Sequence, residues 1–590
     1  MTDEIPSEAE SLIRAAALLN AYRHGGKAES GAVLGRVLAE NKNLRSLARQ
    51  LAPIVERIVS EVNRLPISEQ ERMFRALGPQ SVKEEQEEKK GVKEETKRLP
   101  PLPNVQRYDR VVTRFAPNPD SVLHLGSTRA IILSHDYARM YSGIFILRYE
   151  DTDPRLKRSA LELYRYVLED LEWLGCKPDQ VFYQSDRLEV YYEYAKKLIE
   201  LGGAYVCTCS QENFRSYIIK GEPCPDRNVP VPDTLLRWNR MLNAGYGEGE
   251  AVLRVKTDLN HPNPAVRDWP AMRIIDTAKH KHPRVGSKYR VWPLYNWSAG
   301  LDDHLMGVTH IIRGQEHATN AVRQKYFYNA FGWSYPEAIH YGRLMIEGGE
   351  LSKSKIERGI REGVYDGYDD PRLATLRALR RRGIVPQAIR RLILEIGPKS
   401  SDVTVSWDNL LSYNRQIIDR TSPRRFAVFG PRELHVMGVP EDQLRVALPR
   451  HPDVPEMGAR EFVIHKEKDG VYRLLVQSED LETNRATRLI GLMNIQVESL
   501  SPDTKPALAR FLGYTPEEAR KIRAKAVQWL PSEGNVDIMV TMPDATKDRG
   551  IGEGGISQEE VGTVVQFERL FFARLDSKKD KECSFIFTSK

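Results

Sequence analysis

Strand and helix patterns alternate through the middle of this chain, and that alternation limits the fold more than any other feature. The stretch RVVTRFAP (110–117) is typical of a buried strand followed by a turn and a helix, and IFILRYEDTDP (144–154) of a second strand ending in an acidic turn. ALELYRYVLEDLEWLG (160–175) is an amphipathic helix. Strands that alternate with helices predict a parallel α/β sheet, with ligands at the carboxyl ends of its strands.

The two ends of the chain differ from this middle part. With 590 residues the chain is too long for one core. Residues 7–64 are predicted to be helical, with one apolar stripe made of Leu44, Leu47, Leu51, Val55, Ile58 and Val62. A run of mixed charge that closes on prolines then marks a boundary. After about residue 426 short alternating strands, with a hairpin signal at Asp469-Gly470, predict one or two β-barrels.

Composition narrows the class of protein only slightly. The chain has 41% hydrophobic residues and a formal net charge of +7, which permits an anionic partner without demanding one. No apolar run is long enough for a membrane span, and the acidic, amphipathic start is unlike a signal peptide. The lack of such a run predicts no membrane contact. Five cysteines in such a length speak against a disulfide framework and predict a protein of the reducing cytoplasm.

Two glycine-bearing stretches carry the clearest chemistry. In RFAPNPDSVLHLGSTRA (114–130) a glycine turn precedes a helix, where backbone N–H groups can meet a phosphate and His124 adds a donor. Taken alone, a glycine after a strand is more often plain turn geometry. In GRLMIEGGELSKSKI (342–356) Lys353 lies between two serines on a glycine-rich loop that could close over a triphosphate. Taken alone, Lys353 could be a solvated surface lysine.

In this order, the two stretches resemble the HIGH and KMSKS signatures of class I aminoacyl-tRNA synthetases. The blocks LRYEDTDP, VRDWPAMRIID, YRVWPLYNWSAGLDDHLMGVTHIIRGQEH and YDDPRLATLRALRRRGI are similar to glutamyl-tRNA synthetases of the archaeal and eukaryotic type. That type shares its β-barrel C-terminus with glutaminyl-tRNA synthetases. The similarity runs from about residue 104 to the C-terminus. Ser127 stands in place of the second histidine of the first signature, and Glu350-Leu351 in place of the leading Lys-Met of the second.

The resemblance implies a multidomain α/β plus all-β fold with a Rossmann-like catalytic domain. Its expected parts, in chain order, are an N-terminal helical domain (1–80), a charged, proline-closed linker (81–103), the first catalytic half (104–204), an insertion that binds the acceptor end (205–280), the second catalytic half with the KMSKS-like loop (281–355), a helical segment that contacts the tRNA stem (356–425) and a β-barrel anticodon-binding domain (426–590). The N-terminal helices are a candidate surface for a protein partner.

The activity implied is ATP-dependent attachment of L-glutamate to the 3′ end of tRNA-Glu through a glutamyl-adenylate, with Mg²⁺ accompanying the triphosphate. Whether tRNA-Gln is also charged stays open. By the resemblance His124 and Lys353 are the catalytic residues, and Gly126, Ser127 and Arg343 are further ATP contacts. A glutaminyl-tRNA synthetase, a small-molecule nucleotidyltransferase and a catalytically silent RNA-binding relative are the alternatives. The second of these would leave the basic helical segment and the barrels unexplained.

Charge must separate glutamate from glutamine, because the two amino acids are nearly isosteric. By the resemblance Glu150 takes the substrate ammonium, Tyr295 lines the pocket and Arg114 points inward. Arg313 matches a position that is uncharged in glutaminyl-tRNA synthetases, and we predict that it pairs with the side-chain carboxylate of glutamate. The alternative is a surface arginine paired with Glu316.

Two further sets of residues are candidates for ligand contacts. Three thiols and a carboxylate, in an arrangement related to a zinc pattern of glutamyl-tRNA synthetases, are Cys207, Cys209, Cys224 and Asp226. Three reduced cysteines without metal are the alternative. A basic triplet, Arg380, Arg381 and Arg382, is predicted to meet the tRNA, against the alternative of a solvated helix face.

Overall fold

The computed structural model divides the chain into two compact units, Met1–Thr96 and Lys97–Lys590. It describes residues 9–23, 26–40, 47–66, 69–70, 72–73, 99–500, 506–580 and 582–590. Within these ranges no helix is both long and apolar enough to cross a membrane.

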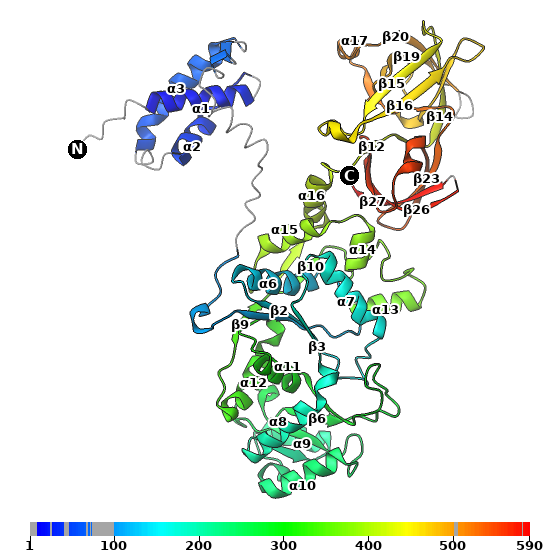
Figure 1. Cartoon of the computed structure of the whole chain (residues 1–590). Helices are drawn as coiled ribbons and strands as arrows, with labels where there is room; N and C mark the ends of the chain where they lie inside the picture. Colours follow the sequence, from blue (N-terminus) through cyan, green and yellow to red (C-terminus); the bar gives the residue numbers. More distant parts are fainter. Residues whose placement is uncertain are drawn as a thin grey trace. The chain divides into compact units, whose positions relative to one another are not determined.

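The first unit is a small helical bundle, as the sequence predicts. Its helices are α1 (Ala9–Arg23), α2 (Ser30–Glu40) and α3 (Ala48–Arg64), and they share one apolar core (Figure 1). The predicted stripe faces this core, because Leu47, Leu51, Val55, Ile58 and Val62 are all buried. Leu44 and most of the predicted linker, up to residue 98, lie outside the described residues.

A parallel sheet forms the centre of the second unit, which confirms the predicted α/β class. Strands β1 (Val112–Phe115), β2 (Ile144–Tyr149) and β3 (Gln180–Tyr183) pair in parallel in that order. Helix α6 (Ser127–Met140) connects β1 to β2, and α7 (Leu161–Trp173) lies between β2 and β3 in the chain.

A second parallel pair extends this sheet on the side of β1. The pair consists of β8 (His310–Gly314) and β9 (Glu337–Tyr341). The Thr309 amide donates to the Val112 carbonyl at 2.9 Å, which places β8 beside β1. The carboxyl ends of β1, β2 and β8 therefore meet at one edge of the sheet.

The segment just before β1 belongs to this unit, so the predicted linker boundary at residue 103 is wrong. Leu102 is buried in the catalytic core, and the Pro103 carbonyl lies 2.8 Å from His310 Nε2. Because Leu102 is buried in the core, the second unit begins before residue 103, earlier than the proline-rich composition indicates.

The predicted insertion is a four-stranded antiparallel sheet with its own helices. The strands are β4 (Ala204–Cys207), β5 (Val252–Val255), β6 (Pro270–Ile274) and β7 (Val291–Pro293), and the helices are α8 (Leu188–Glu200), α9 (Gln211–Lys220) and α10 (Val231–Leu242). Because β7 completes the sheet, the insertion extends beyond the predicted end at residue 280. Its core also includes side chains of α11 (Tyr295–Leu305) and α12 (Ala318–Phe331).

The predicted stem-contact segment is mostly helical. Its helices are α13 (Lys353–Arg361), α14 (Leu376–Arg381), α15 (Pro386–Ile396) and α16 (Trp407–Ile418). One strand interrupts them: β11 (Val403–Val405) pairs in parallel with β10 (Leu344–Ile346). This pairing ties the segment to the strand that precedes the KMSKS-like loop.

The C-terminal part contains two seven-stranded sheets, each with its own core, and one two-stranded ribbon. The elements are β12 (Arg424–Arg425), β13 (Ala427–Phe429), β14 (Pro431–Met437), β15 (Gln443–Pro449), β16 (Ala459–His465), β17 (Tyr472–Gln477), β18 (Ala486–Leu489), β19 (Met493–Ser499), β20 (Ala507–Gly513), α17 (Pro516–Lys521), β21 (Lys525–Val527), β22 (Leu530–Pro531), β23 (Val536–Thr541), β24 (Lys547–Gly552), β25 (Val564–Phe567), β26 (Phe571–Lys579) and β27 (Glu582–Ser589). The predicted all-β character from about residue 426 is confirmed.

One predicted hairpin in this part is wrong. Gly470 does form a turn with a φ of +82°. However, β16 pairs with β15, and β17 pairs with β14, so the two flanking strands enter different sheets. The Asp-Gly signal correctly predicts that the chain reverses direction at this point. Which strand pairs with which depends on packing against residues far away in the sequence, and the local signal does not contain that information.

Candidate active site

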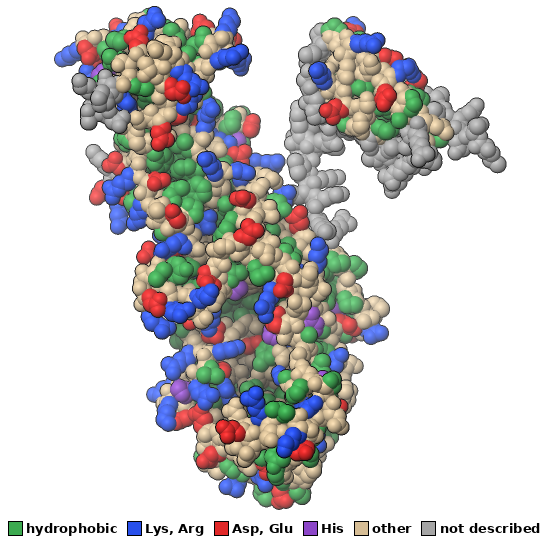
Figure 2. All heavy atoms as spheres, turned by 180° about the vertical axis from the view of Figure 1, so that it is seen from behind, with side chains coloured by type: hydrophobic (Ala, Val, Ile, Leu, Met, Phe, Trp, Pro, Cys, Tyr) green, Lys and Arg blue, Asp and Glu red, His purple; other side chains and the backbone are tan. Residues whose placement is uncertain are grey.

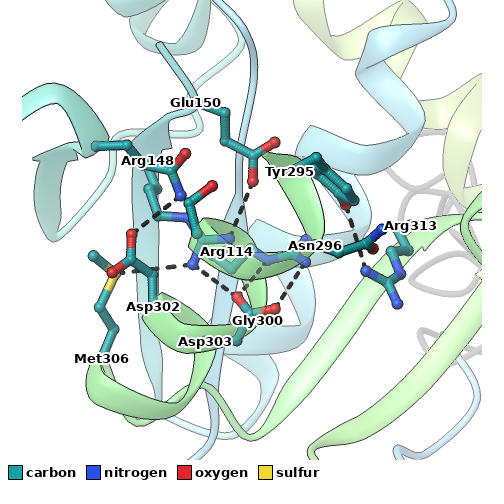
Figure 3. Close-up of polar contacts among 12 residues, drawn as sticks. Arg114, Arg148, Glu150, Tyr295, Asn296, Gly300, Asp302, Asp303, Met306 and Arg313 are labelled. Carbon is teal, nitrogen blue, oxygen red and sulfur yellow. Dashed lines mark hydrogen bonds and ion pairs between the residues drawn. The ribbon is translucent and has the colours of Figure 1, made fainter. Parts of the chain in front are cut away.

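Four predicted amino-acid-binding residues meet at the carboxyl edge of the parallel sheet (Figure 3). Arg114 lies on β1, Glu150 directly follows β2, and Arg313 lies near the end of β8. Tyr295 begins α11, which follows the last strand of the insertion. Residues far apart in the sequence are thus brought to one ligand-binding edge.

Asp303 on α11 is the centre of this cluster. It accepts from Arg114 Nε at 3.0 Å and Nη2 at 3.2 Å, and from Arg148 Nη1 at 2.8 Å (Figure 3). Arg148 and Asp303 are fully buried and Arg114 nearly so. Burial alone would raise the pKa of Asp303, but the two guanidinium groups outweigh it and hold that pKa at about 2.

Glu150 shares the second of these arginines. Its Oε1 atom accepts from Arg148 Nη2 at 3.2 Å. Burial raises the pKa of Glu150 above its ordinary value, although Arg148 and Arg114 act in the opposite direction. A carboxylate held beside two cations at the rim of this pocket can receive an ammonium group once it is ionised.

Arg313 is buried, with 4% of its surface exposed, and both of its recorded partners are neutral. Nη1 donates to the Tyr295 hydroxyl at 3.4 Å and Nη2 to the Tyr335 hydroxyl at 3.1 Å. Among the residues that the structure describes, no carboxylate forms an ion pair with Arg313, and Nε has no partner. The alternative of a surface arginine paired with Glu316 is therefore wrong. A buried guanidinium of this kind can accommodate an incoming anion.

The HIGH-like turn has the geometry of a close backbone approach. Ser127 begins α6, and its hydroxyl accepts from the His124 amide at 3.4 Å. A Cβ atom at Gly126 would lie 2.9 Å from His124 Cε1, so only glycine leaves room for the imidazole ring. Burial lowers the pKa of His124, which is therefore neutral near pH 7.

The KMSKS-like loop lies against this turn. Lys353 is the first residue of α13, and its Nζ atom lies 2.5 Å from Oδ2 of Asp120, four positions before His124. Within the loop Glu350 accepts from the Ser352 amide at 2.7 Å and lies 3.2 Å from Lys355 Nζ. The residue that replaces the family's first lysine thus makes contacts inside the loop.

Arg343 is exposed and directly precedes β10, and backbone contacts fix its position. Its amide donates to Asp402 Oδ1 at 2.7 Å. The preceding carbonyl, of Gly342, accepts from Arg129 Nη1 at 2.5 Å, and Arg129 is fully buried in α6. The helix that carries Ser127 therefore also positions the backbone just before Arg343.

The three cysteines of the predicted zinc site gather in the insertion. The Sγ atoms of Cys207, Cys209 and Cys224 all lie within 4.8 Å of one another. Asp226 lies beside them, with Oδ2 3.7 Å from Cys209 Sγ. Its carboxylate also accepts from the Thr208 amide at 2.7 Å and from Arg237 at 2.6 Å.

The members of the predicted basic triplet, at the end of α14, lie in three different environments. Arg380 is exposed, and Arg381 pairs with Asp576 of β26 at 2.7 Å. Arg382 is buried, and its guanidinium lies 4.6 Å from the centre of the Trp407 ring. The prediction of a tRNA contact is wrong for Arg382, because packing against α16 takes its side chain away from the surface.

Sequence reasoning missed four residues that shape the site: Asp120, Arg148, Asp303 and Tyr335. A charged residue inside an apolar strand, such as Arg148 in IFILRY, is a signal that could have indicated a buried ion pair. The sequence contains no comparable signal for the partner of that arginine, because Asp303 follows it only after an entire inserted domain.

The fold and the site are those of a class I aminoacyl-tRNA synthetase. They combine a Rossmann-like sheet, a glycine turn that faces a lysine-bearing loop, and two C-terminal β-units, by which we mean the two seven-stranded sheets with their cores. Residues 110–420 match the model of the catalytic domain of tRNA synthetases class I (E and Q), and residues 422–512 match that family's anti-codon binding domain. The chain belongs to this family. A small-molecule nucleotidyltransferase would not need an anticodon-binding domain, so this match argues against that alternative.

Curated relatives match along nearly the whole chain. A glutamate--tRNA ligase of Thermococcus kodakarensis is 50% identical over 587 residues, which cover 99% of this chain and 100% of the relative. A glutamate--tRNA ligase of Pyrococcus abyssi is 49% identical over 590 residues, with the same coverage. A solved glutamate tRNA ligase of Elizabethkingia meningosepticum is 21% identical with a TM-score of 0.37, over 53% of this chain and 70% of that chain.

We predict that Asp303→Asn destabilises the catalytic unit by about 3–5 kcal/mol at pH 7, because two buried arginines lose their carboxylate. The pKa of Asp303 is depressed from 3.8 to about 2, so its contribution to stability is complete above pH 3.8 and disappears as the pH falls through about 2. Unfolding of both proteins is to be followed at several pH values in this range. The exposed Asp233 supplies the control, Asp233→Asn. A difference between wild type and Asp303→Asn that does not shrink with falling pH would contradict this assignment.

Proposed function

We propose that this chain attaches L-glutamate to the 3′ end of tRNA-Glu, using ATP and passing through glutamyl-adenylate. The observation that carries this proposal is Arg313, a buried cation at the strand edge whose recorded partners are two tyrosine hydroxyls. The names of the curated relatives support the same substrate. The glutaminyl alternative is less well supported, because a neutral amide would leave this guanidinium uncompensated.

The pocket supplies a partner for each charged group of glutamate. Arg313 pairs with the side-chain carboxylate, and Tyr295 forms the adjacent wall. Glu150 receives the ammonium group. Arg114 holds Asp303 with Nε and Nη2, and this leaves its Nη1 atom for the substrate.

The first chemical step joins glutamate to the nucleotide. An oxygen of the α-carboxylate attacks the α-phosphorus of ATP, the bond to the bridging oxygen breaks, and pyrophosphate leaves. His124 and Lys353 stabilise the developing negative charge, with Gly126 and Ser127 forming the turn beneath the phosphates and Arg343 along the nucleotide. Mg²⁺ accompanies the triphosphate. In the second step the terminal ribose hydroxyl of tRNA attacks the activated carbonyl and AMP leaves.

The tRNA lies along the remaining parts of the second unit. The insertion contacts the acceptor end, Arg380 is the candidate from the basic triplet, and the β-units read the anticodon. Figure 2 shows Lys and Arg side chains along one face of the molecule, interspersed with Asp and Glu. Whether tRNA-Gln is charged too depends on anticodon contacts of these units.

The compartment and the zinc site also belong to this proposal. None of the five cysteines forms a disulfide in the structure, which suits a reducing cytoplasm. The mutual closeness of three thiols suits tetrahedral zinc, with Asp226 as fourth ligand and Thr208 and Arg237 as its outer partners. The metal would hold the strand β4 against the loop that carries Cys224. The N-terminal helices remain a proposed surface for a protein partner.

The substrate is tested by charging separate tRNA-Glu and tRNA-Gln transcripts with labelled glutamate and labelled glutamine. We expect wild type to prefer glutamate. Arg313→Cys should lower kcat/KM for glutamate by a factor equivalent to a loss of about 2–5 kcal/mol in transition-state stabilisation, because one partner of a buried charge pair is removed. It should reduce kcat/KM for glutamine much less. An unchanged glutamate-to-glutamine ratio would exclude Arg313 as the determinant.

The role of Lys353 is tested by Lys353→Ala, with substitution of an exposed residue of the same helix, Arg358→Ala, as the control. Loss of Lys353 should slow adenylate formation by roughly 100-fold or more while the KM for ATP changes little, because the contact strengthens in the transition state. Pyrophosphate exchange with tRNA present measures this rate, since the family implies that tRNA binds before glutamate is activated. Equal effects of the two substitutions would contradict the assignment.

The zinc site is tested by metal analysis of protein purified without chelator. About one equivalent of zinc is expected, and Cys224→Ser should lose it because the thiolate is a ligand. Cys583→Ser removes a buried cysteine outside the cluster and should retain the metal. Less than roughly a tenth of an equivalent in wild type would leave the alternative of three reduced cysteines.

A further inference from the structure

We propose that Tyr335 is a positioning residue for amino-acid specificity, which holds Arg313 in place through its hydroxyl oxygen without neutralising the charge of the guanidinium. Tyr335 lies in the turn between α12 and β9, and it accepts from Arg313 Nη2 at 3.1 Å. The inference rests on the proposed function, because it concerns how Arg313 meets the side-chain carboxylate of glutamate.

The direction of the Tyr335 hydrogen bonds is fixed by a third residue. The Tyr335 hydroxyl lies 2.6 Å from Oε1 of Gln324 and donates its proton there. Gln324 is fully buried on α12, and its Nε2 atom donates to the Asn296 carbonyl at 3.3 Å. With its proton committed to Gln324, the hydroxyl presents a lone pair to Arg313.

The same contacts connect both terminal nitrogens of the guanidinium to one frame. Asn296 directly follows Tyr295, whose hydroxyl accepts from Nη1 of Arg313 at 3.4 Å. The path from Tyr335 through Gln324 therefore returns to α11, the helix that supplies the other partner. Both nitrogens are held by neutral oxygens, and the position of the planar group is defined at two points.

The charge of Arg313 is preserved by this choice of partners. Burial raises the pKa of Tyr335 to about 12, so the phenol stays protonated at neutral pH. The nearby carboxylate of Asp303 is already shared by Arg114 and Arg148. A carboxylate in place of Tyr335 would hold Arg313 equally well but would cancel the charge that distinguishes glutamate from glutamine.

Tyr335 also packs as an aromatic ring, so its structural contribution has to be separated from its effect on Arg313. Its ring centre lies 4.9 Å from that of Tyr328. Tyr328 is fully buried, and its hydroxyl donates to the Gly300 carbonyl at 2.7 Å. Tyr328→Phe therefore removes a buried hydroxyl from the same aromatic cluster without touching Arg313, which makes it a matched control for Tyr335→Phe.

The test compares kcat/KM for glutamate and for glutamine in wild type, Tyr335→Phe and Tyr328→Phe. Tyr335→Phe is expected to lower the value for glutamate by about 10- to 100-fold, mainly through KM, and to lower that for glutamine by less than about threefold. Tyr328→Phe should leave the ratio within about threefold of wild type, even if both variants unfold at lower temperature. An unchanged ratio in Tyr335→Phe would overturn the inference.

A double variant establishes that Tyr335 acts through Arg313. In an Arg313→Cys background, Tyr335→Phe should cause no further change in the ratio, because the group that it positions is absent. A further loss of similar size would assign Tyr335 a direct or purely structural role instead. The proposed function fails separately, if wild type does not prefer glutamate or Arg313→Cys keeps that preference. If both of those results hold and Tyr335→Phe keeps the ratio, only the present inference falls.

Discussion

The pocket depends on one set of contacts, the ion pairs of the buried Asp303 carboxylate with two arginines. Asp303 lies on α11 and accepts hydrogen bonds from Arg114 of β1 and Arg148 of β2. These contacts fix the positions of the helix and the two strands relative to one another. Two buried guanidinium groups without this carboxylate would be strongly unfavourable. Because Asp303 is fully engaged by these two arginines, it does not neutralise Arg313. The cluster thus fixes both the shape of the pocket and the sign of its unbalanced charge.

In the KMSKS-like loop, too, different charged residues have different roles. Glu350 stands where the family has its first lysine, and its contacts with Ser352 and Lys355 order the loop from within. Lys353 is then the cation that reaches across to the HIGH-like turn, where Asp120 holds it. A departure from the signature therefore changes how the loop is ordered, while the lysine that faces the proposed phosphate position is retained.

Periodicity and local motifs predicted the elements well, but they did not predict contacts between distant elements. The alternation of strands and helices correctly predicted the parallel sheet. The pairing of Arg148 with Asp303 was missed because it crosses the inserted domain. Arg382 was misassigned because α14 is short and its composition does not reveal which side packs against Trp407. The linker boundary failed for a related reason, since the burial of Leu102 is a property of the folded core.

Selection between two isosteric amino acids requires a cation that is buried and still unneutralised, and these two requirements oppose each other. Burial strengthens the attraction for a carboxylate, but it also makes an uncompensated guanidinium unfavourable before the substrate arrives. Neutral oxygens resolve the conflict, because Tyr295 and Tyr335 satisfy two N–H donors of Arg313 and leave its charge intact. Under the proposed function, the side-chain carboxylate of glutamate would supply the missing anion and lower the free energy of the complex, whereas the amide of glutamine would supply only a dipole. In the proposed arrangement, specificity would arise from the uncompensated charge of Arg313 before the substrate binds as much as from the contacts that the substrate then makes.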